Sequence, residues 1–167
     1  MKLQLPVHKN EHRTGTVTDL TYEGNGVIKV DHYPIFIPNA LSGETIEYVV
    51  TKVSKNFAWG RALAWQTKSA DRVELADQRY LQTGIAPLGH LSYPAQLKFK
   101  QKLLVDLLAK AHLPLEVAPT LGMKTPVRYR NKAQVPVKLI RGRLETGFYK
   151  RGSHDLVPIE DFLIQDP

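Results

Sequence analysis

Residues 44–65, ETIEYVVTKVSKNFAWGRALAW, carry the pattern that decides the fold of the first half of the chain. Side chains alternate from residue 44 to residue 55, and one face receives Ile46, Tyr48 and Val50. Period two is typical of a half-buried strand, because successive side chains point to opposite faces. Residues 57–65 then predict the last strand of the set.

The residues upstream add further short strands. Residues 14–18, 27–30 and 33–37 have β-like character, with breaks at Glu23-Gly24-Asn25-Gly26 and at 39–43. About five short strands at spacings near ten residues, joined by glycine turns, are typical of a small barrel. We therefore predict a closed five-stranded barrel of the oligonucleotide-binding (OB) type.

A second informative stretch is residues 126–151, PVRYRNKAQVPVKLIRGRLETGFYKR. Residues 127–139 alternate strictly, which predicts one strand with its cations on the solvent face. Gly142 predicts a reversal, and residues 144–149 predict the returning strand. The second half should therefore contain a basic antiparallel sheet.

The charge of this stretch points to a polyanion. Residues 124–151 hold nine cations and one acid, a net charge of +8, against +7 for the whole chain. A solvated strand that protects a sheet edge is the alternative, but a cluster of one sign repels itself. We expect phosphate contacts, which arginine makes in bidentate geometry, from Arg128, Arg130, Lys132, Lys138, Arg141 and Arg143.

The predicted barrel also offers candidate contacts to RNA. Phe57 and Trp59 would stack on unpaired bases, and the neighbouring cations Lys52, Lys55 and Arg61 would hold the backbone. Aromatic residues also fill small cores, so a position in the core remains the alternative for both rings.

Two other segments are assigned no catalytic or binding role. Residues 94–111 predict a helix, with Pro94 in its first turn and a leucine stripe that should pack on a core. Ser153, His154 and Asp155 are sequence neighbours, so their side chains diverge along a strand and cannot converge as a catalytic triad requires.

The composition of the chain excludes several kinds of site and several classes of protein. The chain has no cysteine, which excludes disulfides, cysteine-ligated metals and a thiol nucleophile within these residues. No apolar run approaches the roughly 20 residues of a membrane span, and we expect no membrane partner. These features and a basic composition predict a cytoplasmic protein that binds nucleic acid. We also expect a monomer, which composition by itself does not determine.

Several phrases resemble a known family. Gly24-Asn25-Gly26-Val27, the segment 35–44 (IFIPNALSGE) and 55–61 (KNFAWGR) resemble the TRAM domain, a barrel of RNA-modifying enzymes. The segments 90–101 (HLSYPAQLKFKQ), 129–133 (YRNKA) and 147–165 (GFYKRGSHDLVPIEDFLIQ) resemble the TRAM-bearing RNA uridine-C5 methyltransferases. The resemblance implies 5-methyluridine formation in ribosomal or transfer RNA.

The sequence departs from this family in two respects. Many members bind a [4Fe–4S] cluster through cysteines whose positions fall at about Asp77, Thr83, Ala86 and Phe162 here. None of these side chains replaces a thiolate, so we expect no iron–sulfur cluster and expect Ile85, Leu88 and Phe162 to pack the space. Members also continue into a domain that binds S-adenosylmethionine and supplies the cysteine that attacks uracil C6.

Together these observations predict an OB-like barrel over residues 1–66, a linker over 67–82 and a small α/β domain with one main helix over 83–167. We expect the RNA-recognition part of a methyltransferase, inactive alone, that presents a flipped uridine to a catalytic domain. The partner would be 23S ribosomal RNA first and transfer RNA second. The alternatives are a free-standing RNA-binding module and a protein-interaction domain with an acidic partner.

Overall fold

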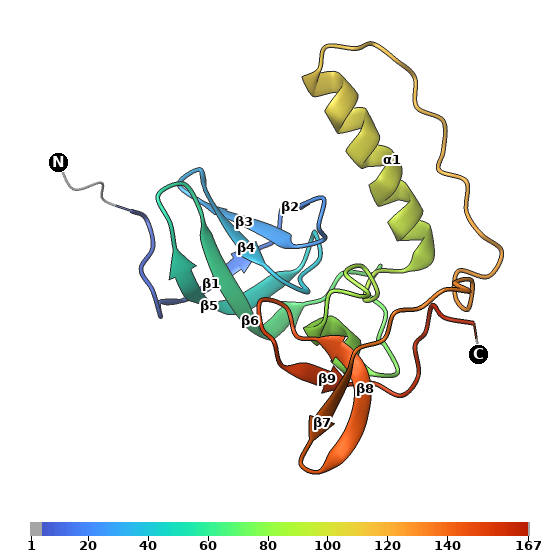
Figure 1. The fold of residues 1–167 in the computed structure, drawn as a ribbon. Helices are drawn as coiled ribbons and strands as arrows, with labels where there is room; N and C mark the ends of the chain where they lie inside the picture. Colours follow the sequence, from blue (N-terminus) through green and yellow to red (C-terminus); the bar gives the residue numbers. More distant parts are fainter. Residues whose placement is uncertain (1–4, 167) are drawn as a thin grey trace. The chain divides into compact units, whose positions relative to one another are not determined.

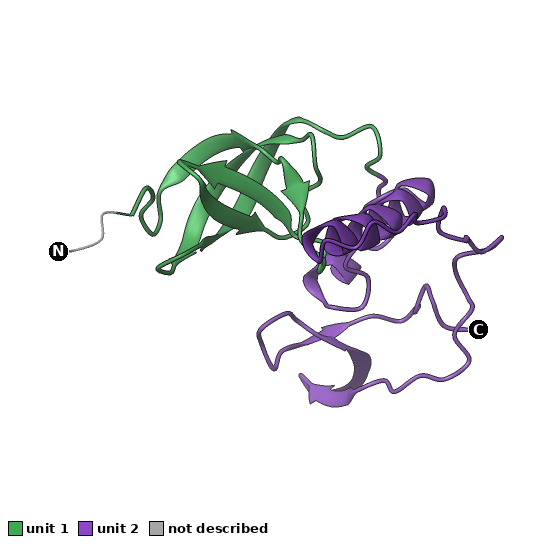
Figure 2. Ribbon diagram, turned by 90° about the horizontal axis from the view of Figure 1, so that it is seen from above, with its two compact units in different colours: residues 1–72 green, residues 73–167 purple. Residues whose placement is uncertain are grey.

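The chain forms two compact units, Met1–Arg72 and Val73–Pro167 (Figure 2). The computed structural model describes residues 5–166. The boundary between the units falls within residues 67–82, for which the sequence predicts a linker. The last strand of the first unit continues to Thr67, and a short 3₁₀ helix, η1 (Gln78–Gln82), belongs to the second unit.

Six strands form a single sheet in the first unit, in the order β1-β5-β6-β4-β3-β2 (Figure 1). Neighbouring strands are antiparallel except for β4 and β6, which are parallel. The strands are β1 (His12–Thr16), β2 (Asp19–Leu20), β3 (Gly26–Val30), β4 (Tyr33–Ile37), β5 (Thr45–Val53) and β6 (Ala58–Thr67). The predicted run of short strands is confirmed, with six segments where we expected five.

The alternation in β5 places its apolar residues in the core, as predicted. Ile46, Tyr48 and Val50 are buried there with Ile35 and Ile37 of β4. Gly60 of β6 permits this packing, because an added Cβ would lie 2.5 Å from Ile37 Cδ1. The residues between these core positions point to the outer face of the sheet.

The closed barrel predicted from the sequence is wrong in one respect, since the two end strands do not hydrogen-bond to each other. β1 and β2 are instead consecutive in the chain, separated by Val17 and Thr18. The Val17 N–H donates to the Glu44 carbonyl at 2.8 Å, and the Thr18 N–H donates to the Val27 carbonyl at 2.9 Å. Residues 12–20 therefore form one bent segment that contributes both edge strands of a barrel-like sheet.

A buried carboxylate ties the end of the first unit to this sheet. Glu44 accepts hydrogen bonds from the Leu41 and Ser69 N–H groups, from Trp65 Nε1 and from the Arg72 guanidinium. Burial alone would raise the pKa of Glu44, but these hydrogen bonds, with that of Arg72 the strongest, lower the pKa to about 2. The Arg72 guanidinium also lies over the Trp65 ring, 5.1 Å from its centroid.

The second unit contains an antiparallel three-stranded sheet, in the order β7-β8-β9. Its strands are β7 (Val137–Ile140), β8 (Arg143–Tyr149) and β9 (Leu156–Pro158). Arg141 and Gly142 form the turn between β7 and β8, both with positive φ (52° and 80°). The predicted hairpin and its reversal at Gly142 are confirmed.

The prediction of one continuous strand over residues 127–139 is wrong, because only residues 137–140 are in a strand. Arg128 has a φ of +56°, which breaks an extended run, and Pro136 cannot donate to a ladder. Among residues 127–136 the structure has one isolated bridge, a parallel one between Arg130 and Gln165. Arg128, Arg130 and Lys132 therefore lie in an irregular segment and not on the basic sheet that we expected.

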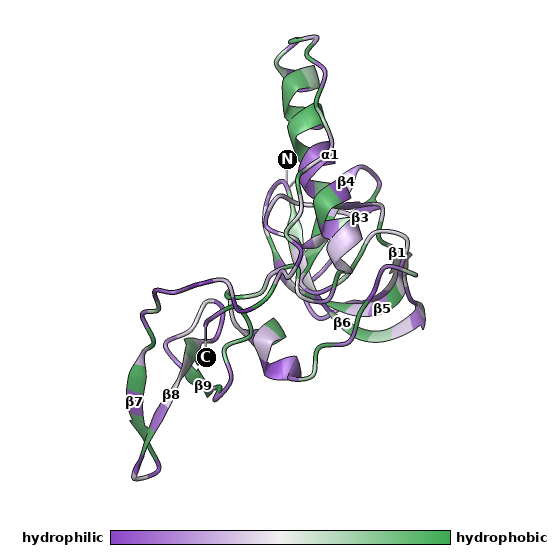
Figure 3. Cartoon of the chain, turned by 90° about the vertical axis from the view of Figure 1, so that its right-hand side faces the viewer, coloured by the Kyte–Doolittle hydropathy of each residue, from purple (hydrophilic) through white to green (hydrophobic). Residues whose placement is uncertain are grey.

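The predicted helix is present as α1 (Tyr93–Lys110), but the prediction that it packs on a core is wrong for the described residues. Ala95 is its one buried residue, whereas Leu104 and Leu107 are 47% and 54% exposed. In Figure 3 the green bands along α1 mark its hydrophobic residues. Within residues 5–166 no helix is long and apolar enough to cross a membrane.

Candidate nucleic-acid interface

Three aromatic side chains gather on the outer face of the first sheet. Phe36 of β4 lies opposite Trp59 of β6 in the parallel register, and their ring centroids are 5.4 Å apart. The Phe57 ring lies 5.6 Å from Phe36. All three are half-buried and lie outside the core. We call Phe36, Phe57 and Trp59 the aromatic cluster.

Exposed cations flank the aromatic cluster. Lys52 of β5 lies opposite Trp59, so both side chains are on the same face of the sheet. Arg61 follows Trp59 by two residues and shares that face by the period of the strand. Lys55 lies in the turn that the Ser54 N–H closes by donating to the Phe57 carbonyl at 2.9 Å. The arrangement offers stacking surfaces with cations beside them, as in proteins that bind single-stranded nucleic acid.

The aromatic cluster resolves an alternative that the sequence left open. Phe57 and Trp59 lie on the surface and not in the barrel core. The sequence prediction missed Phe36, although the alternation within residues 33–37 would have found it. Tyr33, Ile35 and Ile37 are buried, so Phe36 must point outward.

The predicted phosphate contacts of the second unit fall into two groups. Lys138 on β7, Arg141 in the turn and Arg143 on β8 are exposed on the hairpin. Lys138 lies opposite Glu145 in the register and donates to the His154 carbonyl at 3.2 Å. Arg141 and Arg143 lie at the hairpin tip, so their side chains face solvent.

The other group occupies the irregular segment before β7. Arg128 Nη1 lies 2.6 Å from Asp161 Oδ1, and the hydrogen bond from Arg128 lowers the pKa of Asp161. Arg130 has its backbone fixed by hydrogen bonds to Ile164 and Asp166, and its side chain borders a pocket. Lys132 is exposed. Arg128 therefore already has an anionic partner, whereas Arg130 and Lys132 are better placed to bind a phosphate.

Residues 10–63, which include β1 to β5, most of β6 and the aromatic cluster, match the family model described as the TRAM domain. The first unit contains a TRAM domain. The aromatic cluster and its flanking cations thus lie entirely within the TRAM domain, and no residue of the second unit belongs to them. The resemblance to the TRAM domain stated from the sequence is confirmed for residues 10–63.

The whole chain is also similar to larger bacterial proteins. It is 56% identical over 168 aligned residues to a Lactiplantibacillus plantarum protein named "Uncharacterized RNA methyltransferase", covering 100% of this chain and 37% of that protein. An Enterococcus faecalis protein of the same name is 48% identical, with 97% of this chain and 36% of that protein covered. The chain thus spans a little over a third of the length of these relatives.

One solved structure shows the same fold over both units. The Pyrococcus abyssi tRNA (uracil-54, C5)-methyltransferase, crystallised with S-adenosyl-L-homocysteine, has a TM-score of 0.57 and 23% identity. The likeness covers 92% of this chain and 33% of that enzyme. The fold of the TRAM domain followed by a small second unit therefore also occurs in an enzyme of known structure.

The positions that the resemblance assigns to iron–sulfur ligands do not fit a cluster. The Asp77 carboxylate binds Arg79 at 2.8 Å, and the buried Thr83 hydroxyl donates to the Tyr80 carbonyl at 2.9 Å. Ala86 and Phe162 instead pack with Ile85 against the buried residues of a hydrophobic cluster, and Leu88 is not part of it. These four positions therefore offer no thiolate to iron.

Proposed function

We propose that this chain is the RNA-recognition part of an RNA uridine-C5 methyltransferase. The observation that carries the proposal is the aromatic cluster on the TRAM domain with Lys52 and Arg61 beside it. Rings on a sheet surface bind bases of any sequence by stacking, and the cations attract the RNA backbone. The names of the relatives support methyl transfer to RNA as the reaction of the whole protein.

The division of labour follows from the chemistry. Uracil C5 becomes nucleophilic enough to accept a methyl group after a thiolate adds to C6, and this chain has no cysteine. We propose that a catalytic domain outside these residues supplies the thiolate and binds S-adenosylmethionine, so this chain alone is inactive. The chain would hold the RNA and present a flipped uridine.

For the substrate we propose 23S ribosomal RNA first and transfer RNA second, bound by a monomer in the cytoplasm, where both RNAs occur. Arg130, Lys132, Lys138, Arg141 and Arg143 would contact phosphates, together with Lys52, Lys55 and Arg61 of the TRAM domain. Because Arg128 is paired with Asp161, we expect its contribution to RNA binding to be the smallest of the set.

Helix α1 favours this proposal over a free-standing RNA-binding module. Its exposed Leu104, Val105 and Leu107 form an apolar surface. An apolar surface of this kind marks a contact with another protein domain, which a free-standing module would lack. The relatives are nearly three times the length of this chain, so they contain enough additional sequence to cover it. We propose that the catalytic domain packs on this surface.

The test is RNA binding measured as a function of salt. An oligouridine RNA of about 12 nucleotides, within the range that one OB fold covers, should bind with an affinity that falls as salt rises. Charge reversal of Arg130 and Lys132 together should weaken binding and flatten the salt dependence. The matched control reverses two exposed cations of α1, Lys100→Glu and Lys110→Glu, and so changes the net charge by the same amount.

Unchanged affinity in the double variant would remove Arg130 and Lys132 from the interface and leave the hairpin cations as the candidates of the second unit. Equal binding of the chain to RNA and to an acidic peptide would instead support a protein-interaction domain. Methyl transfer by the chain alone would overturn the proposed division of labour.

A further inference from the structure

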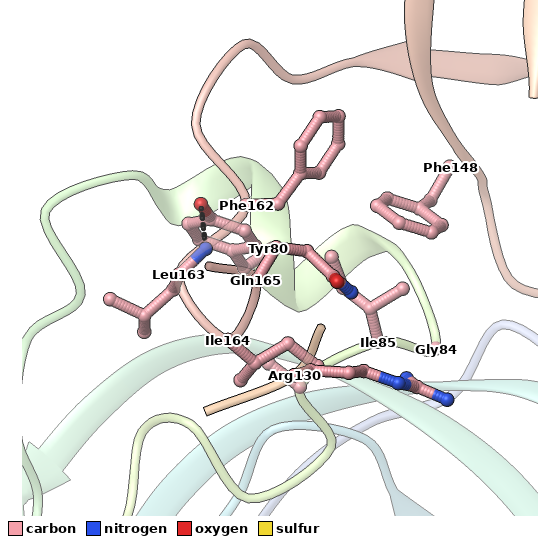
Figure 4. Close-up of a pocket in the computed structure, with 10 residues that line it drawn as sticks. Tyr80, Gly84, Ile85, Arg130, Phe148, Phe162, Leu163, Ile164 and Gln165 are labelled. Atoms are coloured by element: carbon pink, nitrogen blue, oxygen red, sulfur yellow. Dashed lines mark hydrogen bonds between the residues drawn. The ribbon is translucent and has the colours of Figure 1, made fainter. Parts of the chain in front are cut away.

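The second unit contains a cavity that the RNA-binding proposal does not yet use. It has a volume of about 270 Å³ and lies between the segment 80–86, the segment 162–165, Phe148 and Arg130 (Figure 4). The Phe148 and Phe162 rings meet edge to face at its border, with centroids 5.2 Å apart. Its lining is mostly apolar and includes no acidic side chain.

The walls of the cavity are held in place by hydrogen bonds. The Tyr80 hydroxyl donates to the Asp161 carbonyl and accepts from the Leu163 N–H at 3.1 Å. The Arg130 N–H donates to the Ile164 carbonyl at 2.9 Å, and the Asp166 N–H donates to the Arg130 carbonyl at 3.0 Å. Because both sides are fixed before any ligand arrives, binding there costs little conformational entropy.

The cavity also has an uncompensated positive charge. Within residues 5–166 the Arg130 guanidinium has no hydrogen bond or ion pair, in contrast to Arg128 two residues earlier. A second arginine reaches the rim, where Arg151 Nε donates to the carbonyl of Thr83 at 3.0 Å. Thr83 directly precedes Gly84, which is part of the lining.

These features fit one kind of ligand. Apolar and aromatic walls accept a flat ring, and an arginine at the border binds a phosphate or stacks on the ring. The volume lies just below the range of roughly 300–1,000 Å³ for pockets that take drug-sized molecules, so the ligand should be a single ring system. A nucleobase attached to its phosphate combines the two properties.

We propose that this cavity receives one unpaired nucleobase of the bound RNA, with Arg130 on the adjoining phosphate. The inference rests on the proposed RNA-binding function and adds a base-binding site to the second unit. The aromatic cluster of the TRAM domain would then bind one part of a single strand, while the cavity fixes a particular nucleotide of it.

A mononucleotide titration tests the cavity directly. Uridine 5′-monophosphate added to the full 167-residue chain should shift the NMR signals of Ile85, Phe148 and Phe162, whereas ribose 5-phosphate should leave the two phenylalanine signals in place. Arg130→Gln should weaken the nucleotide response, and Lys110→Gln should not. Equal shifts from both ligands would mean a phosphate site only and would overturn the base assignment.

A rim variant tests the cavity in RNA binding. An added Cβ at Gly84 meets no atom within 4 Å, so Gly84→Leu adds bulk at the rim from a position where the first side-chain carbon has open space. We expect it to weaken oligouridine binding about 5- to 160-fold, the range of one lost stacking interaction. The salt dependence should stay the same, because no phosphate contact is removed.

Gln82→Leu provides the control, since it places the same leucine side chain at an exposed position outside the lining. Wild-type affinity in Gly84→Leu would overturn the base-binding site while salt-dependent RNA binding leaves the proposed function intact. If the wild-type chain binds no RNA at all, the proposed function fails, and the mononucleotide titration alone decides whether the cavity takes a base.

Discussion

Arg72 Nε lies 2.5 Å from Glu44 Oε1, and this ion pair joins the last residue of the first compact unit to a fully buried carboxylate. Glu44 side-chain exposure is 0% and that of Arg72 is 11%. Two backbone N–H groups and the Trp65 indole satisfy the rest of the carboxylate. A buried charge of this kind is tolerated when it is paired and fully hydrogen-bonded.

Acid should weaken the TRAM domain through Glu44. Its pKa is about 2 in the folded chain against 4.5 for an ordinary glutamate, so folding favours the ionised form. The stabilisation is complete above the unfolded pKa and is lost as the pH falls toward about 2. Denaturation at several pH values should show a loss on the order of 3 kcal/mol. An equally steep pH dependence in Glu44→Gln would contradict this assignment.

Removing the arginine partner should destabilise the TRAM domain more than removing a surface ion pair. Arg72→Gln leaves the buried Glu44 without its cation, which costs about 3–5 kcal/mol. Arg13→Gln breaks the pair with Glu11, which is about one-third exposed on both sides, and should cost less than about 1 kcal/mol. Urea unfolding of the two variants measures the difference, and similar midpoints would count against a special role for Arg72.

The sheet of the second unit should be sensitive to a methyl group at Gly147. An added Cβ there would lie 2.0 Å from the Val157 carbonyl oxygen, a backbone atom that cannot swing aside. Gly147→Ala should separate β8 from β9 and cost about 3 kcal/mol or more. Gly84→Ala, where the Cβ meets open space, should melt close to wild type. A normal melting temperature in Gly147→Ala would show that the strands can shift to accept the methyl.

The aromatic cluster should contribute to RNA binding and little to stability. Phe36→Ala and Trp59→Ala should each weaken oligouridine binding by about 1–3 kcal/mol, the range for one stacked base. Tyr22→Ala, a largely exposed aromatic residue of the TRAM domain (73% exposed), serves as the control. Fluorescence anisotropy gives the affinities, and unchanged binding in both cluster variants would place the RNA elsewhere.

Helix α1 should tolerate a polar residue on its exposed face. Leu107 is 54% exposed, so Leu107→Gln should change the free energy of unfolding of this chain by less than about 0.5 kcal/mol. In a protein of the length of the relatives, the same change should lower stability, because we propose that the catalytic domain covers this residue. Loss of stability in the 167-residue chain alone would mean that the face is already covered.

The sequence predicted the elements that are determined by residues close together in the chain. The strands within residues 44–65 and the turn at Gly142 follow from alternation and glycine, and both are confirmed. The alternation of residues 127–139 has the same appearance but does not form one strand. There the backbone is fixed by residues 163–166, a partnership that no local pattern records.

The candidate site was predictable only where its residues are close together in the sequence. Trp59 and Phe57 were found from their neighbours in the sequence, but their common surface depends on Phe36, which is more than 20 residues away and adjacent only through sheet pairing. The ion pair of Arg128 with Asp161 is likewise a tertiary contact. The cavity beside Arg130 is assembled from four separate segments, so composition alone gives no sign of it.

The pairing of residues 128–130 with residues 163–166 also sets the order of events during synthesis. The TRAM domain is complete once residue 72 has left the ribosome, because its sheet and the Glu44 pair use no later residue. The second unit lacks the partners of Tyr80, Arg128 and Arg130 until residues 161–166 emerge. A translating ribosome would therefore carry a folded TRAM domain well before the segment with Arg130 acquires its shape.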